Sequence, residues 1–497
     1  MRGARAALGM IVAALTIGGW ACAADTWGYT YKDFEIMAEG SANDALTVGR
    51  QLGAMDESMR ALLHLSSVAS EPPTRVYVLP QAQLAMLDAV WSSEGGGFFR
   101  TGPFDDYVVL PNGPLSANAE VYEQRARALL ASWGLGRLPE WYRQGIALLM
   151  ADARVEHDQL IVGQDLRERS ERIAHNWIPM AQFLQLAAND PTLHRSPDTE
   201  ATYEAQCWWL AHLTLLDTVL DKVMPQYLQR LLMGESQQQA YAATFGIPYE
   251  QLDQYFRKLR GKIVLKRYTA ALPDPVVLTN PPLTTVQVQS RLAELLLAHE
   301  PQAASATQMA KDVLSQEPKN ERALLTLAGQ DFAARRYGAV QERLAELGTS
   351  EELSAASHRA LGTLQAGLAK ARDENMPGSS GVDARGMRAA ARTHLKRAMD
   401  LDPNDPRAPF QLGWMLSTAG DVVGVRELLP KVEAAFYRRP ESADLAELLV
   451  RMHTLAGNTA DVFKYAVAEQ RLAATDADRA RATARVERLR TQLKAPQ

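Results

Sequence analysis

The sequence is poor in several features that mark common functional classes. It has only two cysteines, Cys22 and Cys207, among 497 residues, which excludes a framework of disulfides. The formal net charge of −5 and the lack of basic blocks exclude nucleic acid as the expected partner. No two of the nine histidines lie three or four residues apart, so no helix offers a histidine pair to a metal ion. Cys207 lies in an apolar helical stretch, and we predict a buried, unreactive thiol there.

The N-terminus has the pattern of a secretory signal. Arg2 and Arg5 precede an apolar run over residues 6–20, which is too short to span a bilayer comfortably. Small residues then offer a cleavage site after Ala23. We therefore expect export to the periplasm or beyond, without stable membrane insertion after cleavage. A retained anchor and lipidation at Cys22 are the alternatives.

A proline-rich stretch divides the rest of the chain. Four prolines between positions 273 and 282 cannot continue a helix, so we predict an extended linker over residues 269–284, after the signal of residues 1–23. Residues 25–268 combine strand-like and helical patterns, whereas residues 285–497 are rich in Ala, Leu, Glu and Arg and show helices alone. The predicted fold class is mainly α, with a small α+β N-terminal part followed by an α-solenoid.

Hydrophobic patterns predict individual elements in the N-terminal part. Phe34 and Ile36 alternate with polar neighbours, which favours a strand. Short apolar runs at Arg75–Leu79 and Asp106–Leu110 are typical of buried strands. Apolar residues from Ala45 to Leu62 recur at steps of three and four, which indicates an amphipathic helix.

The C-terminal part shows helix pairs separated by turns that contain proline. One such turn holds Pro403, and the step to the next is close to the ~34 residues of a tetratricopeptide (TPR) unit. The Leu412, Gly413 and Trp414 triplet that follows is similar to the repeat signature. Residues 376–381 are predicted to be a loop inserted inside one repeat. Stacked repeats would present a concave surface for a protein or peptide.

Two segments in residues 121–150 carry the pattern of a zinc peptidase without its ligands. Residues 122–130 have the spacing of a helix that carries H-E-x-x-H, with Tyr122 and Ala126 at the histidine positions. Residues 138–147 are similar to L-P-x-W-x-x-E-G-x-A, with Gln144 at the glutamate position.

With residues 203–216 and 234–236 as a third block, these segments make residues 25–268 resemble a bacterial peptidase MA-like domain of the gluzincin type, joined to TPR units. In that family the two histidines and the later glutamate bind zinc, and the glutamate of H-E-x-x-H is the general base. The resemblance implies that Glu123 is the only one of the four functional positions to keep its residue type.

The replaced side chains are poor zinc ligands. The methyl group of Ala126 has no lone pair, and the phenol of Tyr122 ionises only near pH 10. The neutral amide of Gln144 is a weaker ligand than a carboxylate. We therefore predict no metal ion and no other cofactor, and no catalytic residue beyond the relic position Glu123.

Two interpretations of Glu123 remain open from the sequence. It is either hydrogen-bonded to Tyr122 or Gln144 across the former site, or a solvated helix residue near Arg125 and Arg127.

Three functions follow. The first is a non-catalytic exported scaffold that binds a protein or peptide in the cell envelope, through the solenoid and through a cleft in the N-terminal part. Trp141 and Tyr142 either line a residual groove there or pack in the core. The second is a divergent hydrolase that uses Glu123. The third is a TPR interaction protein whose N-terminal part is only structural.

Overall fold

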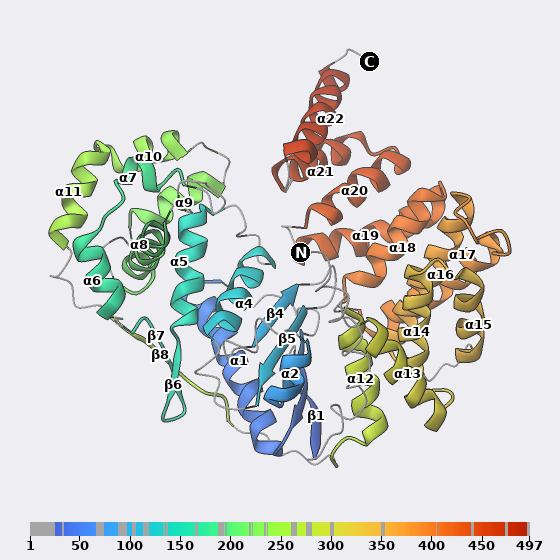
Figure 1. Cartoon of the computed structure of the whole chain (residues 1–497). Coiled ribbons are helices and arrows are strands. Elements are labelled where there is room, and N and C mark those ends of the chain that lie inside the picture. Colours follow the sequence, from blue (N-terminus) through green and yellow to red (C-terminus); the bar gives the residue numbers. More distant parts are fainter. Residues whose placement is uncertain are drawn as a thin grey trace, which may run out of the picture.

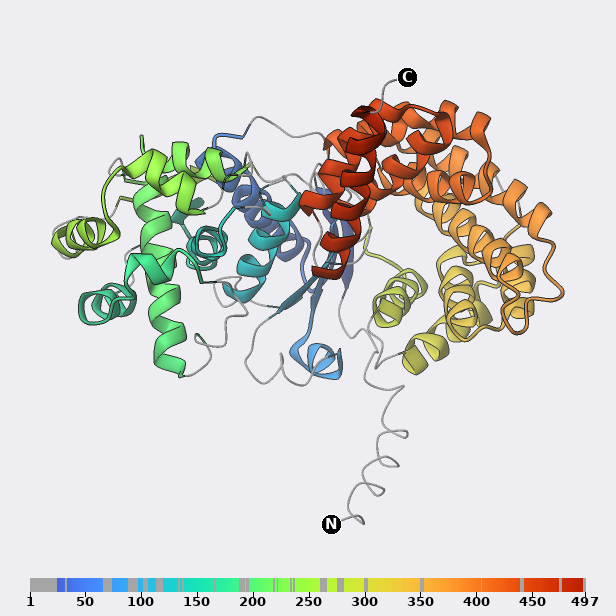
Figure 2. The same ribbon diagram turned by 90° about the horizontal axis from the view of Figure 1, so that it is seen from above.

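The computed structural model describes most of the chain beyond the N-terminal segment. The described residues are 25–31, 34–65, 74–87, 97–101, 106–112, 119–132, 135, 138–164, 167–186, 193, 196–217, 220, 222–223, 224–232, 235, 237–259, 266–274, 281–298, 303–348, 353–403, 405–438, 442–472 and 476–494. The predicted signal, with Cys22 and Ala23, lies outside them. A five-stranded sheet separates a helical lobe from an arc of helix pairs (Figures 1 and 2).

The five-stranded sheet has the order β1-β2-β3-β5-β4. Its two central pairings, β2 with β3 and β3 with β5, are parallel, and the two edge strands are antiparallel. Every residue of β3 is buried, as expected for a central parallel strand covered on both faces. The strands span Thr26–Tyr31 (β1), Phe34–Glu39 (β2), Thr74–Leu79 (β3), Phe98–Thr101 (β4) and Asp106–Pro111 (β5).

Helix α1 (Ala42–Leu62) covers one face of this sheet. It begins at Ser41, whose hydroxyl accepts a hydrogen bond from the Asp44 amide in a capping box. Leu52, Met55 and Met59 on α1 share a core with the sheet residues of that face. The α1 helix is further tied to α4 (Ala119–Ser132) by an ion pair in which Arg125 Nη2 lies 2.8 Å from Asp56 Oδ2.

The helical lobe follows the sheet. Its longest helix, α8 (Pro197–Leu215), is buried along most of its length and packs against α5. The other helices of the lobe are α4 (Ala119–Ser132), α5 (Glu140–Ala151), α6 (Arg167–His175), α7 (Met180–Phe183), α9 (Met224–Leu232), α10 (Gln237–Phe245) and α11 (Tyr249–Leu259). Helix α2 (Gln81–Leu87) lies outside the lobe, and its Leu84 and Leu87 share a core with Tyr77 and Val109 of the sheet.

A second, three-stranded sheet closes the lobe. Strands β6 (Arg154–Glu156) and β7 (Gln159–Val162) form a hairpin, and β8 (Tyr268–Ala271) pairs antiparallel with β7. The first residues of the predicted linker are therefore part of a strand.

The rest of the chain is an α-solenoid of consecutive helix pairs. The first helix of each pair, α12, α14, α16, α18 and α20, also contacts the first helix of the next pair, so these five form the inner layer of the arc. The helices are α12 (Thr285–Ala298), α13 (Ala303–Gln316), α14 (Glu321–Ala333), α15 (Tyr337–Leu347), α16 (Ala355–Asp373), α17 (Ala384–Leu401), α18 (Arg407–Thr418), α19 (Val422–Arg438), α20 (Ala443–Ala456), α21 (Thr459–Leu472) and α22 (Asp476–Lys494).

Residues with a left-handed backbone mark the repeats. Arg335, Asn375, Gly420 and Gly457 all have φ between 52° and 82°, and each follows the inner helix of its pair. The predicted loop at residues 376–381 connects α16 to α17, inside one pair.

The first helix pair of the solenoid packs directly on the five-stranded sheet. Val288 and Leu292 of α12 share a core with Tyr77 and Val109, which point to the face opposite α1. The sheet and the first helix pair thus bury each other, and the proline-rich segment crosses the edge of the sheet, where the Leu283 amide donates to the Thr26 carbonyl at 2.7 Å.

A network of charges reinforces this joint. Glu35 on β2 lies 3.1 Å from Arg322 on α14 and 3.6 Å from Arg291 on α12. Glu294 on α12 pairs with Arg322 at 2.5 Å and also with Arg75 on β3. All five side chains are less than one third exposed, so they are only partly screened by solvent.

The predicted elements of the N-terminal part agree with the structure. The strands expected around Phe34, Arg75 and Asp106 are β2, β3 and β5, and the amphipathic helix over residues 45–62 is α1. None of the helices within the described ranges combines the length and hydrophobicity needed to cross a membrane.

Candidate functional site

The two peptidase-like segments form adjacent helices. Residues 122–130 lie on α4 and residues 140–147 on α5, and the two helices pack against each other. On its other side α5 touches α8 so closely that a Cβ at Gly145 would overlap the Cys207 carbonyl oxygen and lie 2.7 Å from the Ala211 side chain. Glycine at position 145 is therefore required by the helix packing.

Glu123 and Gln144 meet between α4 and α5. The amide Nε2 of Gln144 donates to Glu123 Oε1 at 3.2 Å. The same oxygen accepts from Arg127 Nη2 at 3.2 Å, one helical turn along α4. The structure thus combines both interpretations of Glu123, except that Arg125 faces away and pairs with Asp56.

Arg127 bridges two carboxylates. Its Nη1 lies 3.2 Å from Glu140 Oε1, at the start of α5. Glu140 also pairs with Arg143. Glu123 and Glu140 are 25% and 12% exposed, so the guanidinium neutralises two partly desolvated charges.

Two further carboxylates lie in the same electrostatic environment. Burial, and to a smaller extent the charge on Glu123, raise the pKa of Asp152 to about 6 against the opposing effect of Arg169, whose Nη1 is 2.6 Å away. Burial and the Glu123 charge likewise raise the pKa of Glu204 on α8. The site is therefore an internally paired cluster of carboxylates and guanidinium groups.

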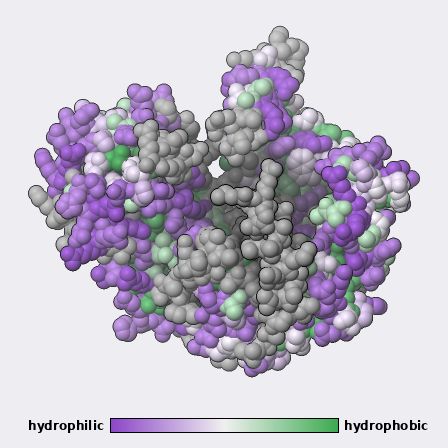
Figure 3. All heavy atoms as spheres, in the orientation of Figure 1, coloured by the Kyte–Doolittle hydropathy of each residue, from purple (hydrophilic) through white to green (hydrophobic). Residues whose placement is uncertain are grey.

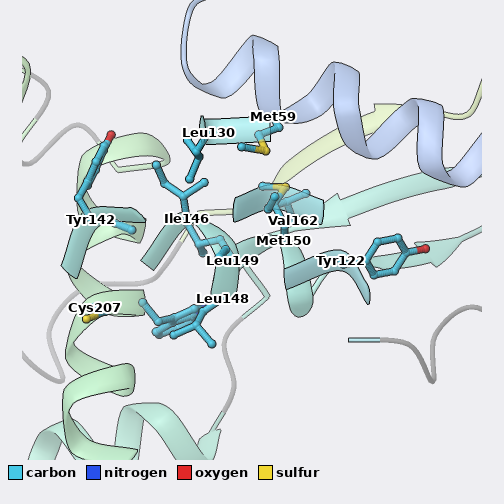
Figure 4. Packing of buried hydrophobic residues seen from close by; sticks show 14 of the residues in the cluster. Met59, Tyr122, Leu130, Tyr142, Ile146, Leu148, Leu149, Met150, Val162 and Cys207 are labelled. Atoms are coloured by element: carbon cyan, nitrogen blue, oxygen red, sulfur yellow. The ribbon is translucent and has the colours of Figure 1, made fainter. Parts of the chain in front are cut away.

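The two residues at the histidine positions of the resembled motif are buried. Tyr122 is 3% exposed and Ala126 is fully buried, both within the core of the lobe. Burial raises the pKa of the Tyr122 phenol above its usual value, which makes a phenolate ligand still less accessible. Figure 4 shows the Tyr122 ring on the opposite side of the cluster from Tyr142 and Cys207.

These residues do not fit a catalytic zinc ion. Zinc requires about three nitrogen, sulfur or carboxylate ligands. Among the residues that the structure describes, no three His, Cys, Asp or Glu side chains converge on a point that could hold a metal. Three hydrogen bonds to Glu123 Oε1 come from protein N–H groups, two from Arg127 and one from Gln144, so this oxygen is held by the protein's own donors.

Trp141 and Tyr142 belong to the core and do not line an open groove. They are 0% and 3% exposed, and their rings contact each other edge to face at 5.4 Å. Phe183 packs against Trp141 at 5.9 Å. The groove interpretation is wrong for both residues, because their side chains are buried in the core of the lobe.

Cys207 and His212 on α8 are both structural. Burial raises the pKa of the Cys207 thiol well above its usual value, in agreement with the predicted unreactive thiol. His212 is fully buried, with Nδ1 2.9 Å from Asp217 Oδ2 and Nε2 3.0 Å from the Gly163 carbonyl. It joins the end of α8 to the turn after β7.

The repeat-signature residues lie on the inner layer of the solenoid. Leu412 is buried, and a Cβ at Gly413 would lie 3.0 Å from Leu448 of α20, so this glycine permits close helix packing. Trp414 is half-buried on α18, and the Arg451 guanidinium lies over its ring at 5.3 Å. Pro403 is exposed in the turn before α18.

Comparison with known proteins adds likenesses to the solenoid. No family model matches the sequence. No curated protein matches it either. YrrB, described as a TPR protein with an unusual peptide-binding site, is 16% identical, with 40% of this chain and 91% of that chain covered at a TM-score of 0.30. PilW, a type IV pilus biogenesis factor, is 19% identical, with 43% of this chain and 93% of that chain covered at a TM-score of 0.32.

A third structure spans more of the sequence. Yeast Tom70 is 12% identical and covers 92% of this chain and 76% of its own, with a TM-score of 0.32. These scores are too low to carry an argument, so the solenoid is assigned from its own helix packing.

Glu140, Asp152 and Glu204 are the site residues that sequence reasoning missed, whereas Arg127 was named as a neighbour of Glu123. The spacing of Glu123 and Arg127, four residues apart, is a recognisable signal for an ion pair on a helix. Glu140, Asp152 and Glu204 have no such signal, because their proximity depends on how α5 and α8 pack.

Proposed function

We propose that this protein is an exported, non-catalytic scaffold. In this proposal a peptidase MA-like domain of the gluzincin type, with a degenerate zinc motif, carries TPR units that bind a protein or peptide in the cell envelope. The single observation that supports it most is the guanidinium of Arg127, which pairs with Glu140 and with Glu123, the residue at the general-base position of the resembled motif.

The pattern of retained and lost residues supports a scaffold. Trp141 fills the core and Gly145 permits the contact of α5 with α8, so the residues that serve packing are kept. Tyr122, Ala126 and Gln144 stand at the positions that serve metal binding. Selection on the fold without selection on zinc chemistry would leave this division.

The solenoid supplies the binding surface in this proposal. Its inner layer presents Trp414 with Arg451 above the ring, an aromatic and cationic pair suited to a peptide. Figure 3 shows a predominantly hydrophilic exterior on the face in view, with apolar residues in small separate spots. A broad apolar interface is therefore not the expected mode of binding on that face.

A structural role for the N-terminal part is the second candidate, and one observation favours it. Because α12 covers one face of the five-stranded sheet, the sheet anchors the first helix pair of the solenoid. The N-terminal part would then serve as the platform from which the solenoid extends.

Restoring the zinc ligands tests the peptidase likeness. The combined variant Tyr122→His, Ala126→His and Gln144→Glu should bind zinc, because a full ligand set contributes on the order of 10 kcal/mol. A matched control, Tyr122→Phe with Ala126→Ser and Gln144→Ala, changes the same positions without adding ligands. Equal zinc affinity in the two variants would contradict the assignment of these positions.

Binding by the solenoid is tested with the full chain. Trp414→Ala should release proteins or peptides captured from envelope extracts by the wild type, whereas Tyr255→Ala, an exposed tyrosine on the remote helix α11, should retain them. Capture that is unaffected by Trp414→Ala would contradict the role of the inner layer.

A further inference from the structure

Tyr437 near the end of α19 forms an exposed cluster with Lys464 of α21. Tyr437 is 60% exposed, although tyrosine is large and partly apolar. The Lys464 ammonium donates a hydrogen bond to Tyr437 Oη at 2.7 Å. The same nitrogen lies 5.2 Å from the centre of the Tyr437 ring and 4.8 Å from that of Tyr465. Two aromatic rings therefore hold the cation beside the phenol oxygen.

A hydrogen-bonded chain behind this pair fixes its geometry. Tyr465 donates from Oη to Glu433 Oε1 at 3.0 Å, and His453 Nε2 lies 3.2 Å from the same oxygen. The His453 ring stacks on that of Tyr465 at 5.2 Å. Tyr465 Oη also lies 3.5 Å from Tyr437 Oη, close enough for a hydrogen bond between the two phenols.

The two tyrosines of this cluster are shifted in opposite directions. The hydrogen bond from Lys464, followed by that with Tyr465, lowers the pKa of the Tyr437 phenol. Burial raises the pKa of Tyr465, and its hydrogen bonds with Tyr437 and Glu433 raise it further. The exposed oxygen is thus the one prepared to ionise.

We propose that Tyr437 is a nucleophilic tyrosine that accepts a phosphoryl group from an acyl phosphate or a phosphoanhydride. The phenol oxygen attacks phosphorus, the new O–P bond forms, and the bond from phosphorus to the leaving carboxylate or phosphate oxygen breaks. The phenol proton passes to solvent, and no group is oxidised or reduced.

The surroundings of Tyr437 favour a phosphoryl over an acyl group. A tyrosine phosphate carries charge that the Lys464 ammonium would pair with, whereas an acyl ester is neutral and removes the acceptor that this ammonium now has. The modification would also break the contact between Tyr437 and Tyr465, which joins α19 to α21.

The test uses the full chain and acetyl phosphate as the donor, with the modified residues read by peptide mass spectrometry. Tyr255 on α11, which is 44% exposed, serves as a reference within the same molecule. We expect phosphorylation of Tyr437 well ahead of Tyr255, and about a tenfold slower reaction at Tyr437 in Lys464→Met for each unit by which its pKa returns toward normal. Lys464→Arg keeps the charge and should retain part of the rate.

Parallel labelling with acetylimidazole separates nucleophilicity from the preference for phosphoryl groups. Faster acetylation of Tyr437 than of Tyr255, together with phosphorylation that depends on Lys464, supports the proposal. Acetylation without phosphorylation overturns the assigned group, and equal rates at Tyr437 and Tyr255 overturn the nucleophile itself. Unchanged phosphorylation in Lys464→Met overturns the role of the ammonium.

Discussion

Gln144 donates a hydrogen bond to Glu123 across the contact between α4 and α5, with 3.2 Å between Nε2 and Oε1. In a gluzincin-type enzyme the two positions would hold a metal ligand and the general base. Gln144 carries a neutral amide, which supplies an N–H donor to Glu123. With Arg127 on the same oxygen, Glu123 is held by the protein itself.

This contact predicts the effect of replacing Gln144 alone by glutamate. Gln144→Glu places a second carboxylate, at a position 5% exposed, against Glu123 and removes the donor. We expect a loss of roughly 1–3 kcal/mol in the free energy of unfolding at pH 7, measured by urea titration. Gln185→Glu, at an exposed position, is the control and should change little. A neutral Gln144→Glu would show that the site tolerates a further charge.

The close contact of α5 with α8 gives a second prediction. Gly145→Ala forces Cβ against the Cys207 carbonyl and should cost roughly 1–3 kcal/mol, seen as a lower midpoint in thermal or urea unfolding. Gly338→Ala on α15, where nothing lies within 4 Å of the added Cβ, should be neutral or stabilise by about 0.5–1 kcal/mol. The same outcome for both variants would contradict the packing described.

The joint between the sheet and the solenoid predicts that the chain cannot be divided at the proline-rich segment. A fragment that ends near Asp274 exposes the sheet face that bears Tyr77 and Val109, which α12 covers in the full chain. We expect it to bind a hydrophobic dye and to aggregate in size-exclusion chromatography. A fragment extended to residue 348 retains α12 and α13 and should do so less. A monomeric, dye-negative short fragment would refute a shared core.

A buried histidine pair predicts acid sensitivity of the solenoid. His358 Nδ1 on α16 lies 2.9 Å from His394 Nδ1 on α17, and burial lowers the pKa of both. The charge on His358 lowers the pKa of His394 further, and the charge on Arg397 lowers the pKa of His358. The unfolded chain therefore takes up protons more readily, so the pair's contribution to stability is present above the usual histidine pKa of about 6.5 and is lost as the pH falls below it.

The measurement is the free energy of unfolding between pH 8 and pH 5. The double variant His358→Gln and His394→Gln should flatten the pH dependence, by about 1.4 kcal/mol for each unit of pKa shift removed. His175→Gln, at an exposed position, is the control. An unchanged profile in the double variant would exclude the pair as the source.

Sequence reasoning reached the elements that carry their own pattern. The apolar run at Arg75–Leu79 and the periodicity from Ala45 to Leu62 both correspond to real elements, because each reflects burial of a strand or of one helix face. Strand β4 has only four residues and β8 pairs with a strand about a hundred residues earlier, so neither has a local signature. The cover of the sheet by α12 likewise depends on tertiary packing.

At the candidate site, too, sequence reasoning reached the residues with a local pattern and missed those that meet only through tertiary packing. The meeting of Glu123 with Gln144 was one of two interpretations that the motif spacing allowed. The burial of Tyr142 was also one of two interpretations, because an aromatic residue at the start of a helix suits a groove and a core equally. The approach of His358 to His394, on different helices, has no counterpart in histidine spacing.

The most direct test of the central claim is the zinc content of the purified full chain. After saturation with zinc and removal of free metal, elemental analysis should find far less than one zinc per chain, and the combined variant Tyr122→His, Ala126→His and Gln144→Glu should approach one. One tightly bound zinc per chain in the wild type, lost on substitution of Glu123 or Gln144, would contradict the account.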